Sequence, residues 1–135
     1  MRPRAARPEY GLETTATNDQ PDPRVRDHPR LGPLPDAPGV RFTFDGRPLA
    51  GRAGEPIAAA LLAAGVRVFR TMPRTGEARG GSCLVGRCAD CWVVVDGEPN
   101  VRACLEPVRD GMAVRTQRGL GEDAWRPPDP GAATG

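Results

Sequence analysis

The residues of this sequence best suited to chemistry are its four cysteines, Cys83, Cys88, Cys91 and Cys104. The first three form a C-x4-C-x2-C pattern, and 12 residues separate the third from the fourth. Four thiols in one chain can form disulfides, hold a zinc ion or hold an iron–sulfur cluster as thiolates. The pattern uses every cysteine of the chain, so none is left for a second site.

The spacing of the cysteines favours one of these three alternatives over the other two. Disulfides are the weaker interpretation, because the chain shows no export signal and the cytosol keeps thiols reduced. Zinc fits less well, since structural zinc sites usually combine two C-x2-C pairs. The C-x4-C-x2-C…C spacing is the ligand set of plant-type [2Fe–2S] clusters, in which one loop supplies three thiolates. The sequence therefore favours a [2Fe–2S] cluster on the four cysteines, with zinc and disulfides as alternatives.

The residues around the cysteines suit a negatively charged cluster. The glycines of the loop, Gly80, Gly81 and Gly86, let the backbone curl tightly and leave amides free to point at sulfur. Arg79 and Arg87 would lower the cost of the cluster's negative charge. We expect four residues to line the cofactor: Gly81, Gly86, Arg87 and Ala89.

Charge in the cysteine loop also predicts its redox behaviour. Positive side chains near a cluster favour the reduced form, which carries one more negative charge. The loop has more basic than acidic residues, namely Arg70, Arg74, Arg79 and Arg87 against Glu77 and Asp90. We therefore predict a reduction potential above the roughly −400 mV of plant-type ferredoxins. The alternative is that the arginines point into solvent and are screened, which leaves solvent exposure and sulfur hydrogen bonds to set the potential.

Short elements on either side of the cysteine loop must position it. Alternation of apolar and polar residues predicts a strand at 40–44. Apolar residues and Asp-Gly turn signals predict further strands at 47–52, 66–69, 92–95, 98–103 and 112–116. A run of helix formers, Ile57 to Ala64, predicts one short helix with Pro56 in its first turn and Gly65 as its stop. The 22 residues from Arg70 to Cys91 show neither period, and holding a cluster would explain so long a loop. The predicted fold class is α+β.

Composition limits the number of domains to one. The chain has 135 residues, of which 39% are apolar, too few for a second core. Residues 1–38 hold 8 of the 16 prolines and show no apolar periodicity, so we expect a disordered segment. Residues 119–135 predict a second disordered tail, which leaves 39–118 as the folded domain.

Several function classes are excluded by charge and hydropathy. A net charge of +2 and singly scattered arginines argue against nucleic-acid binding. The longest mainly apolar stretch, Ile57 to Val66, has 10 residues, which predicts no membrane span and a cytoplasmic protein. The only histidine, His28, lies in the N-terminal segment, and no nucleophile is paired with a base. We expect no catalysis by this chain alone.

With these motifs in place, the core resembles the small [2Fe–2S] ferredoxin-like subunits of FAD-dependent amino-acid and amine dehydrogenase complexes. Similar domains occur in the sarcosine oxidase α chain, in hydrogen cyanide synthase and in dehydrogenases of proline and hydroxyproline. The resemblance covers about 80 of the 135 residues and rests on four segments: Phe42 to Leu49, Ala60 to Gly65, Gly81 to Gly97 and Asn100 to Cys104.

This resemblance implies a β-grasp fold and a division of the cysteines between two irons. Cys83 and Cys88 would hold the iron nearer the surface, and Cys91 and Cys104 the inner one. It also implies that FAD is bound by a partner subunit, from which this chain accepts single electrons. A stand-alone ferredoxin between a reductase and an oxygenase is one alternative, although such carriers have a longer gap before the last cysteine. A non-redox zinc scaffold is the other.

Overall fold

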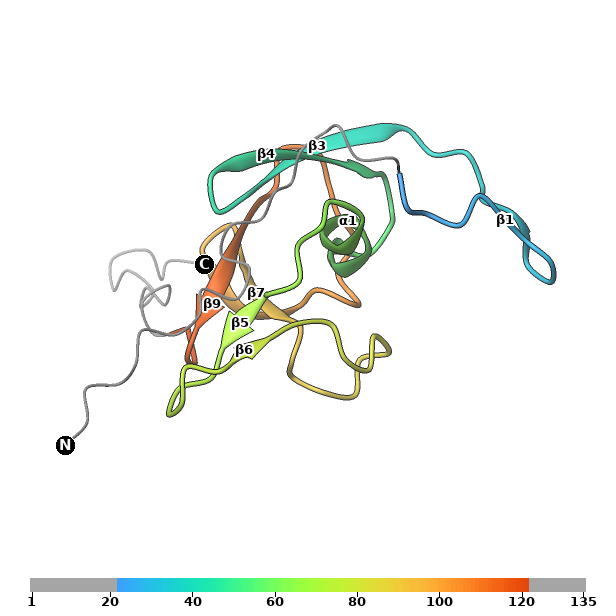
Figure 1. Ribbon diagram of the computed structural model, residues 1–135. Coiled ribbons are helices and arrows are strands. Elements are labelled where there is room, and N and C mark those ends of the chain that lie inside the picture. Colours follow the sequence, from blue (N-terminus) through green and yellow to red (C-terminus); the bar gives the residue numbers. More distant parts are fainter. Residues whose placement is uncertain (1–21, 122–135) are drawn as a thin grey trace, which may run out of the picture.

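The computed structural model describes residues 22–121 (Figure 1). The predicted tails therefore fall largely outside the described residues, at 1–21 and 122–135. Within the described part, seven strands form one mixed sheet and two form a separate hairpin. The helix α1 (Ile57–Ala63) is far shorter than a membrane-spanning helix, and residues 22–121 contain no helix that is long and apolar enough to cross a membrane.

The first hairpin of the main sheet is the one the sequence predicts. Strands β3 (Gly39–Phe44) and β4 (Arg47–Arg52) pair antiparallel, with Phe44 opposite Arg47. Asp45 and Gly46 have φ values of 49° and 81°, the left-handed conformations that a tight two-residue turn requires. Alternate side chains of β3 are buried, as the apolar alternation indicates.

Strand β9 (Ala113–Arg118) is the centre of the sheet. Val114 pairs with Phe44 of β3 in parallel and with Val95 of β7 (Trp92–Val95) in antiparallel orientation, so β9 is covered on both edges. Strand β8 (Glu98–Arg102) returns from β7 as a second hairpin. These three strands confirm the elements predicted for the C-terminal half of the domain.

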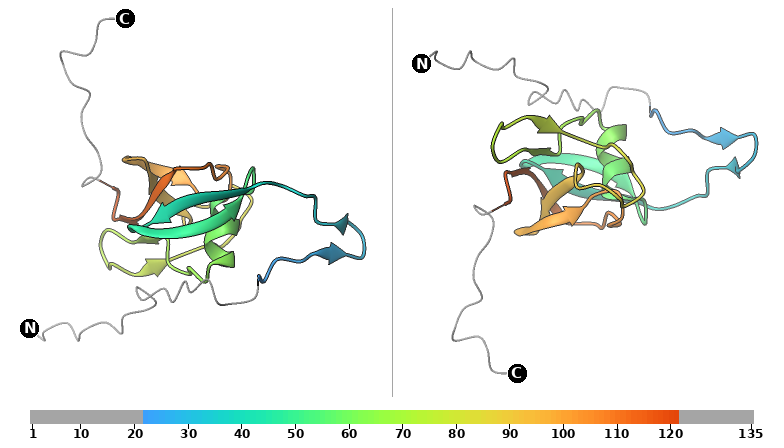
Figure 2. Two further views of the ribbon diagram at one scale, coloured as in Figure 1. Left: turned by 90° about the horizontal axis from the view of Figure 1, so that it is seen from above. Right: turned by 90° about the horizontal axis from the view of Figure 1, so that it is seen from below.

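Helix α1 packs against one face of the β3–β4 hairpin, and both views of Figure 2 show the two elements side by side. Its residues Ile57, Ala60 and Leu61 are fully buried. Gly51 lets β4 approach closely, since a Cβ added there would lie 3.3 Å from that of Ala60. Pro56 precedes the helix as its N-cap and is not inside the first turn. The helix and sheet share one core that includes Phe42, Phe44, Phe69, Val93, Val108 and Val114.

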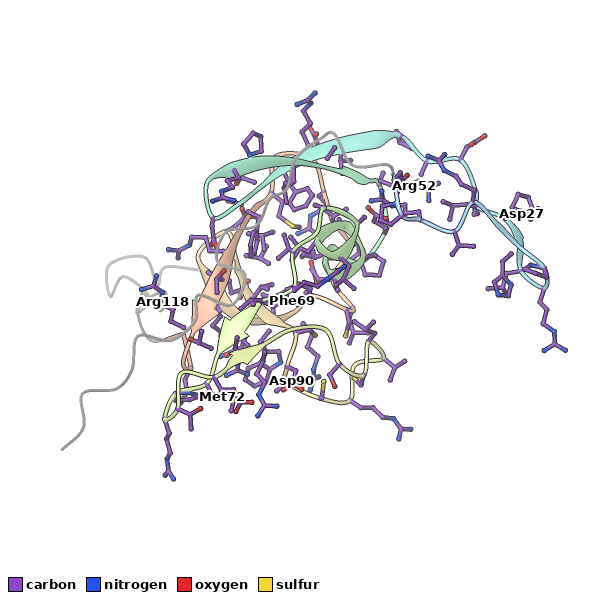
Figure 3. The ribbon with its side chains drawn as sticks, viewed as in Figure 1. Asp27, Arg52, Phe69, Met72, Asp90 and Arg118 are labelled. Atoms are coloured by element: carbon purple, nitrogen blue, oxygen red, sulfur yellow. The ribbon has the colours of Figure 1, made fainter. Side chains whose placement is uncertain are left out.

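The sequence prediction was wrong about one strand and about the loop that follows it. Residues 66–69 form no strand, whereas β5 (Arg70–Thr71) and β6 (Ala78–Arg79) form a short hairpin inside the predicted loop. Val66 and Phe69 are apolar because they fill the core (Figure 3 labels Phe69), not because they alternate on a sheet face. Strand β5 pairs in parallel with the end of β9.

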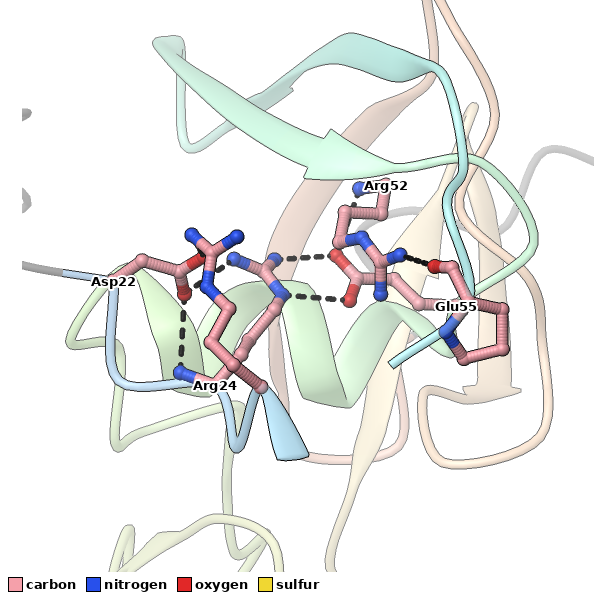
Figure 4. Close-up of polar contacts among 6 residues, drawn as sticks. Asp22, Arg24, Arg52 and Glu55 are labelled. Carbon is pink, nitrogen blue, oxygen red and sulfur yellow. Dashed lines mark hydrogen bonds and ion pairs between the residues drawn. The ribbon is translucent and has the colours of Figure 1, made fainter. Parts of the chain in front are cut away.

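A second feature that the sequence analysis did not predict is a projecting arm made of residues 22–38 (Figures 1 and 2). Its strands β1 (Asp27–His28) and β2 (Gly32–Pro33) pair antiparallel, and the His28 Nδ1 atom accepts the amides of the turn. Arg24 joins the arm to the domain through two hydrogen bonds to Glu55, at 3.0 and 2.5 Å (Figure 4). The Arg52 guanidinium also donates to the Pro35 carbonyl.

Candidate metal centre

The four cysteines meet in two pairs. Cys83 and Cys88 are partly exposed and are linked by a hydrogen bond from the Cys88 amide to the Cys83 sulfur, while Cys91 and Cys104 form a second, buried pair. All four thiols are free of disulfides. Nowhere in residues 22–121 do three or more histidine, cysteine or acidic side chains form a group that could hold a metal ion. The described site is thus a set of two thiol pairs.

Backbone amides converge on the outer pair. The amides of Val85, Cys88 and Arg87 donate to the Cys83 sulfur over 3.5, 3.3 and 3.3 Å. These donors lower the pKa of the Cys83 thiol to about 6, so the sulfur is largely thiolate at neutral pH. The thiolate is the form that binds metals. Arg87, a residue that we expected at the cofactor, contributes its amide, and its side chain is exposed.

The loop backbone adopts a tight curl to bring these amides together. Leu84 and Gly86 have positive φ values of 56° and 78°, between the two cysteines of the outer pair. A Cβ on Gly86 would lie 2.8 Å from a methyl group of Leu105, and one on Gly81 equally close to Leu84. A Cβ on Gly80 would lie only 2.1 Å from the Arg67 carbonyl oxygen. Glycines therefore shape the loop through close packing as well as through backbone freedom.

The inner pair is fixed by the start of the helix. The carbonyls of Ala103 and Glu106, on either side of Cys104, accept the amides of Ala58 and Ile57 at 2.8 Å. Helix α1 has no side-chain cap, and these carbonyls satisfy two of its free amides. The helix thereby fixes the backbone that carries Cys104. Burial raises the pKa of its neighbour, the Cys91 thiol, so a metal or a positive charge must stabilise the thiolate there.

Two arginines hold the loop between the pairs. The Arg102 Nε atom donates to the Cys88 carbonyl at 3.3 Å, and the Arg70 Nη1 atom donates to the Ala89 carbonyl at 2.8 Å. Asp90, labelled in Figure 3, follows Ala89 in this loop. Sequence reasoning expected Ala89 at the site but assigned no anchoring role to either arginine. The sequence carries no local signal for this role, because the two hydrogen bonds join residues 14 and 19 positions apart.

The fold and the donor set together define a ferredoxin-like protein of the β-grasp type. Four free thiols, paired two by two, fit a cluster in which each of two irons takes two thiolates. The amides directed at Cys83 supply hydrogen bonds of the kind that tune such clusters. A single structural zinc would instead need four ligands around one point.

Comparison with known proteins agrees with this class. The chain belongs to the family of 2Fe–2S iron–sulfur cluster binding domains, whose model matches residues 37–119. It is therefore a [2Fe–2S] electron-transfer domain, as the resemblance in its sequence indicated. The match includes all four cysteines.

Individual proteins with known names show the similarity in more detail. The chain is 39% identical over 84 residues to the hydrogen cyanide synthase subunit HcnA of Pseudomonas aeruginosa, covering 62% of this chain and 80% of that protein. It is 32% identical over 77 residues to HcnA of Pseudomonas protegens, covering 57% and 72%. Among solved structures, L-proline dehydrogenase from P. horikoshii matches with a TM-score of 0.54 and 27% identity over 61% of this chain. The match spans 16% of that dehydrogenase chain.

Proposed function

We propose that this chain is the [2Fe–2S] subunit of a complex in which an FAD-containing subunit oxidises an amine or an amino acid. The observation that carries the proposal is the pairing of the four thiols, Cys83 with Cys88 and Cys91 with Cys104, in a relative of a hydrogen cyanide synthase subunit. A [2Fe–2S] cluster exchanges one electron at a time, whereas oxidation of a C–N bond releases two. The chain thus lets electrons leave the flavin singly.

Each thiol pair has a separate task in this proposal. The outer pair, Cys83 and Cys88, holds the iron that lies nearer the partner, and three amides stabilise the thiolate of Cys83. The inner pair, Cys91 and Cys104, is buried, which excludes water from the other iron. Gly81, Gly86, Arg87 and Ala89 complete the lining that we propose for the cluster. The folded cluster domain would extend over residues 39–118.

Exposed apolar side chains beside the outer pair support a docking partner. Leu84, Val85 and Leu105 are 44%, 66% and 57% exposed. The first two lie between the outer cysteines in the loop, and Leu105 packs against Gly86. An apolar patch next to a redox centre is the expected form of a surface that a partner covers. Since its four thiols are free, we place the complex in the reducing cytoplasm.

Purification of the tagged full-length chain from its own cells tests the proposal. We expect a flavoprotein to copurify, with FAD released on denaturation, and the complex to reduce an artificial dye when an amine or amino acid is added. A chain that purifies alone with its cluster would favour the stand-alone ferredoxin and contradict the complex. A colourless chain with stoichiometric zinc would contradict both.

A further inference from the structure

Arg70 is a buried cation without an anionic partner. The residue is 3% exposed, and no carboxylate of residues 22–121 forms an ion pair with it. The guanidinium donates to the carbonyls of Ala89 at 2.8 Å and Gly119 at 3.0 Å and lies 5.0 Å from the centre of the Trp92 ring. Its Nε atom is buried and has no hydrogen-bond partner among the residues that the structure describes.

Such a group is costly unless a negative charge lies nearby. An arginine cannot lose its proton at neutral pH, so burial removes water from a permanent charge. Two neutral carbonyls and an aromatic face compensate for part of the hydration free energy that the guanidinium loses. Neither supplies a full negative charge. The residues described around Arg70 therefore leave a positive charge uncompensated.

The position of Arg70 indicates where the missing negative charge belongs. Ala89, which accepts its hydrogen bond, lies between Cys88 of the outer pair and Cys91 of the inner pair. We infer that Arg70 is the buried counter-charge of the cluster, a positioning residue that holds the cysteine loop and raises the reduction potential. This inference rests on the proposed function, since it requires a cluster on the four thiolates.

The other arginines of the cysteine loop lack this combination. Arg74 and Arg87 are exposed, so water and salt screen their charges. Arg79 also has a buried Nε, but its guanidinium pairs with Glu77 at 3.2 Å, and its side chain is 39% exposed. The sequence analysis singled out Arg79 and Arg87 as the arginines that offset the cluster's charge, whereas in the structure Arg70 is the one shielded from water.

A redox titration of the cluster-loaded protein, followed by its visible spectrum, tests the inference. Arg70→Gln removes the charge and keeps a donor, and we expect it to shift the equilibrium towards the oxidised form at least tenfold, about 59 mV for a one-electron couple. Arg70→Lys keeps the charge and should leave the midpoint near that of the wild type. Arg74→Gln is the matched control for an exposed charge and should change the midpoint little. A shift in Arg70→Gln no larger than in Arg74→Gln, or an equal shift in Arg70→Lys, would overturn the inference.

The wild type provides a second measurement in case Arg70→Gln does not fold. A buried charge escapes screening by salt, so the midpoint should not fall when ionic strength rises from about 0.05 to about 0.5 M. A midpoint that falls with salt would assign the potential to the exposed arginines and overturn the inference. A wild type that binds no cluster would instead contradict the proposed function itself.

Discussion

The backbone amide of Ala58, in the first turn of α1, donates a hydrogen bond to the carbonyl of Ala103 at 2.8 Å. Ala103 directly precedes Cys104, so a helix far away in sequence fixes the backbone of the fourth cysteine. This hydrogen bond joins the two segments of the chain that flank the cysteine loop, one before it and one after it. It explains why a helix without a side-chain cap is stable at this place.

Ala58→Pro should loosen the fourth cysteine. Proline is tolerated in a first helical turn but has no amide to donate, so the Ala103 carbonyl would be left without its partner. We expect a loss of about 1–3 kcal/mol in the free energy of unfolding and less iron bound per chain. Ala58→Ser, which keeps the amide, is the control for added size. Equal iron binding and stability in the two variants would contradict the role of this hydrogen bond.

The two neighbouring glycines at the start of the cysteine loop should differ in their tolerance of alanine. A Cβ on Gly80 would meet the backbone oxygen of Arg67 at 2.1 Å, whereas one on Gly81 would meet the flexible end of Leu84 at 2.8 Å. We expect Gly80→Ala to cost about 3 kcal/mol and Gly81→Ala about 1 kcal/mol or less, measured by chemical unfolding. The reverse order would show that the loop backbone is not constrained by Arg67.

The Arg24–Glu55 pair should control protease access to the arm at residues 22–38. Glu55 is mostly buried and also accepts the Arg52 amide at 2.9 Å, so Glu55→Gln weakens a well-ordered ion pair. We expect trypsin to cleave after Arg26 and Arg30 several-fold faster in this variant, as measured by mass spectrometry. Glu106→Gln removes an exposed ion pair with Arg109 and serves as the control. Cleavage at the same rate in both variants would mean that the pair does not restrain the arm.

Among the four cysteines proposed as ligands, Cys88 is the one whose removal should be least tolerated. Its amide donates to the Cys83 sulfur, and it lies in sequence between two other cysteines, so no spare thiol can replace it. We expect Cys88→Ala to remove the visible absorption, while the far-ultraviolet circular dichroism of the purified variant shows how much of the fold remains. Met112→Leu, which replaces one buried apolar side chain with another of similar volume, is the control and should keep the colour. A coloured Cys88→Ala protein would exclude this residue as a ligand.

Much of the fold follows from local sequence signals. The turn at Asp45 and Gly46 and the alternation on β3 are set by neighbouring residues, and the structure confirms both. The cysteine pattern likewise identified the family, because the spacing of thiolates is dictated by the cluster.

Other features depend on contacts that no local pattern records. The strand β5 exists because Phe69 and Arg70 reach the end of β9, almost fifty residues further along the chain. The arm is tied by Arg24 to Glu55, a partner outside its own segment. Arg70 was indistinguishable from the exposed arginines of the loop until the packing around Trp92 was known. Burial and pairing of single charges are tertiary properties, which composition alone does not predict.

Analysis of metal and acid-labile sulfide in the anaerobically purified chain shows whether the four thiols hold a [2Fe–2S] cluster. Two thiol pairs, Cys83 with Cys88 and Cys91 with Cys104, predict about two irons and about two sulfides per chain, with a red-brown colour that fades on reduction. One zinc per chain, with neither iron nor sulfide, would exclude a [2Fe–2S] cluster on these thiols.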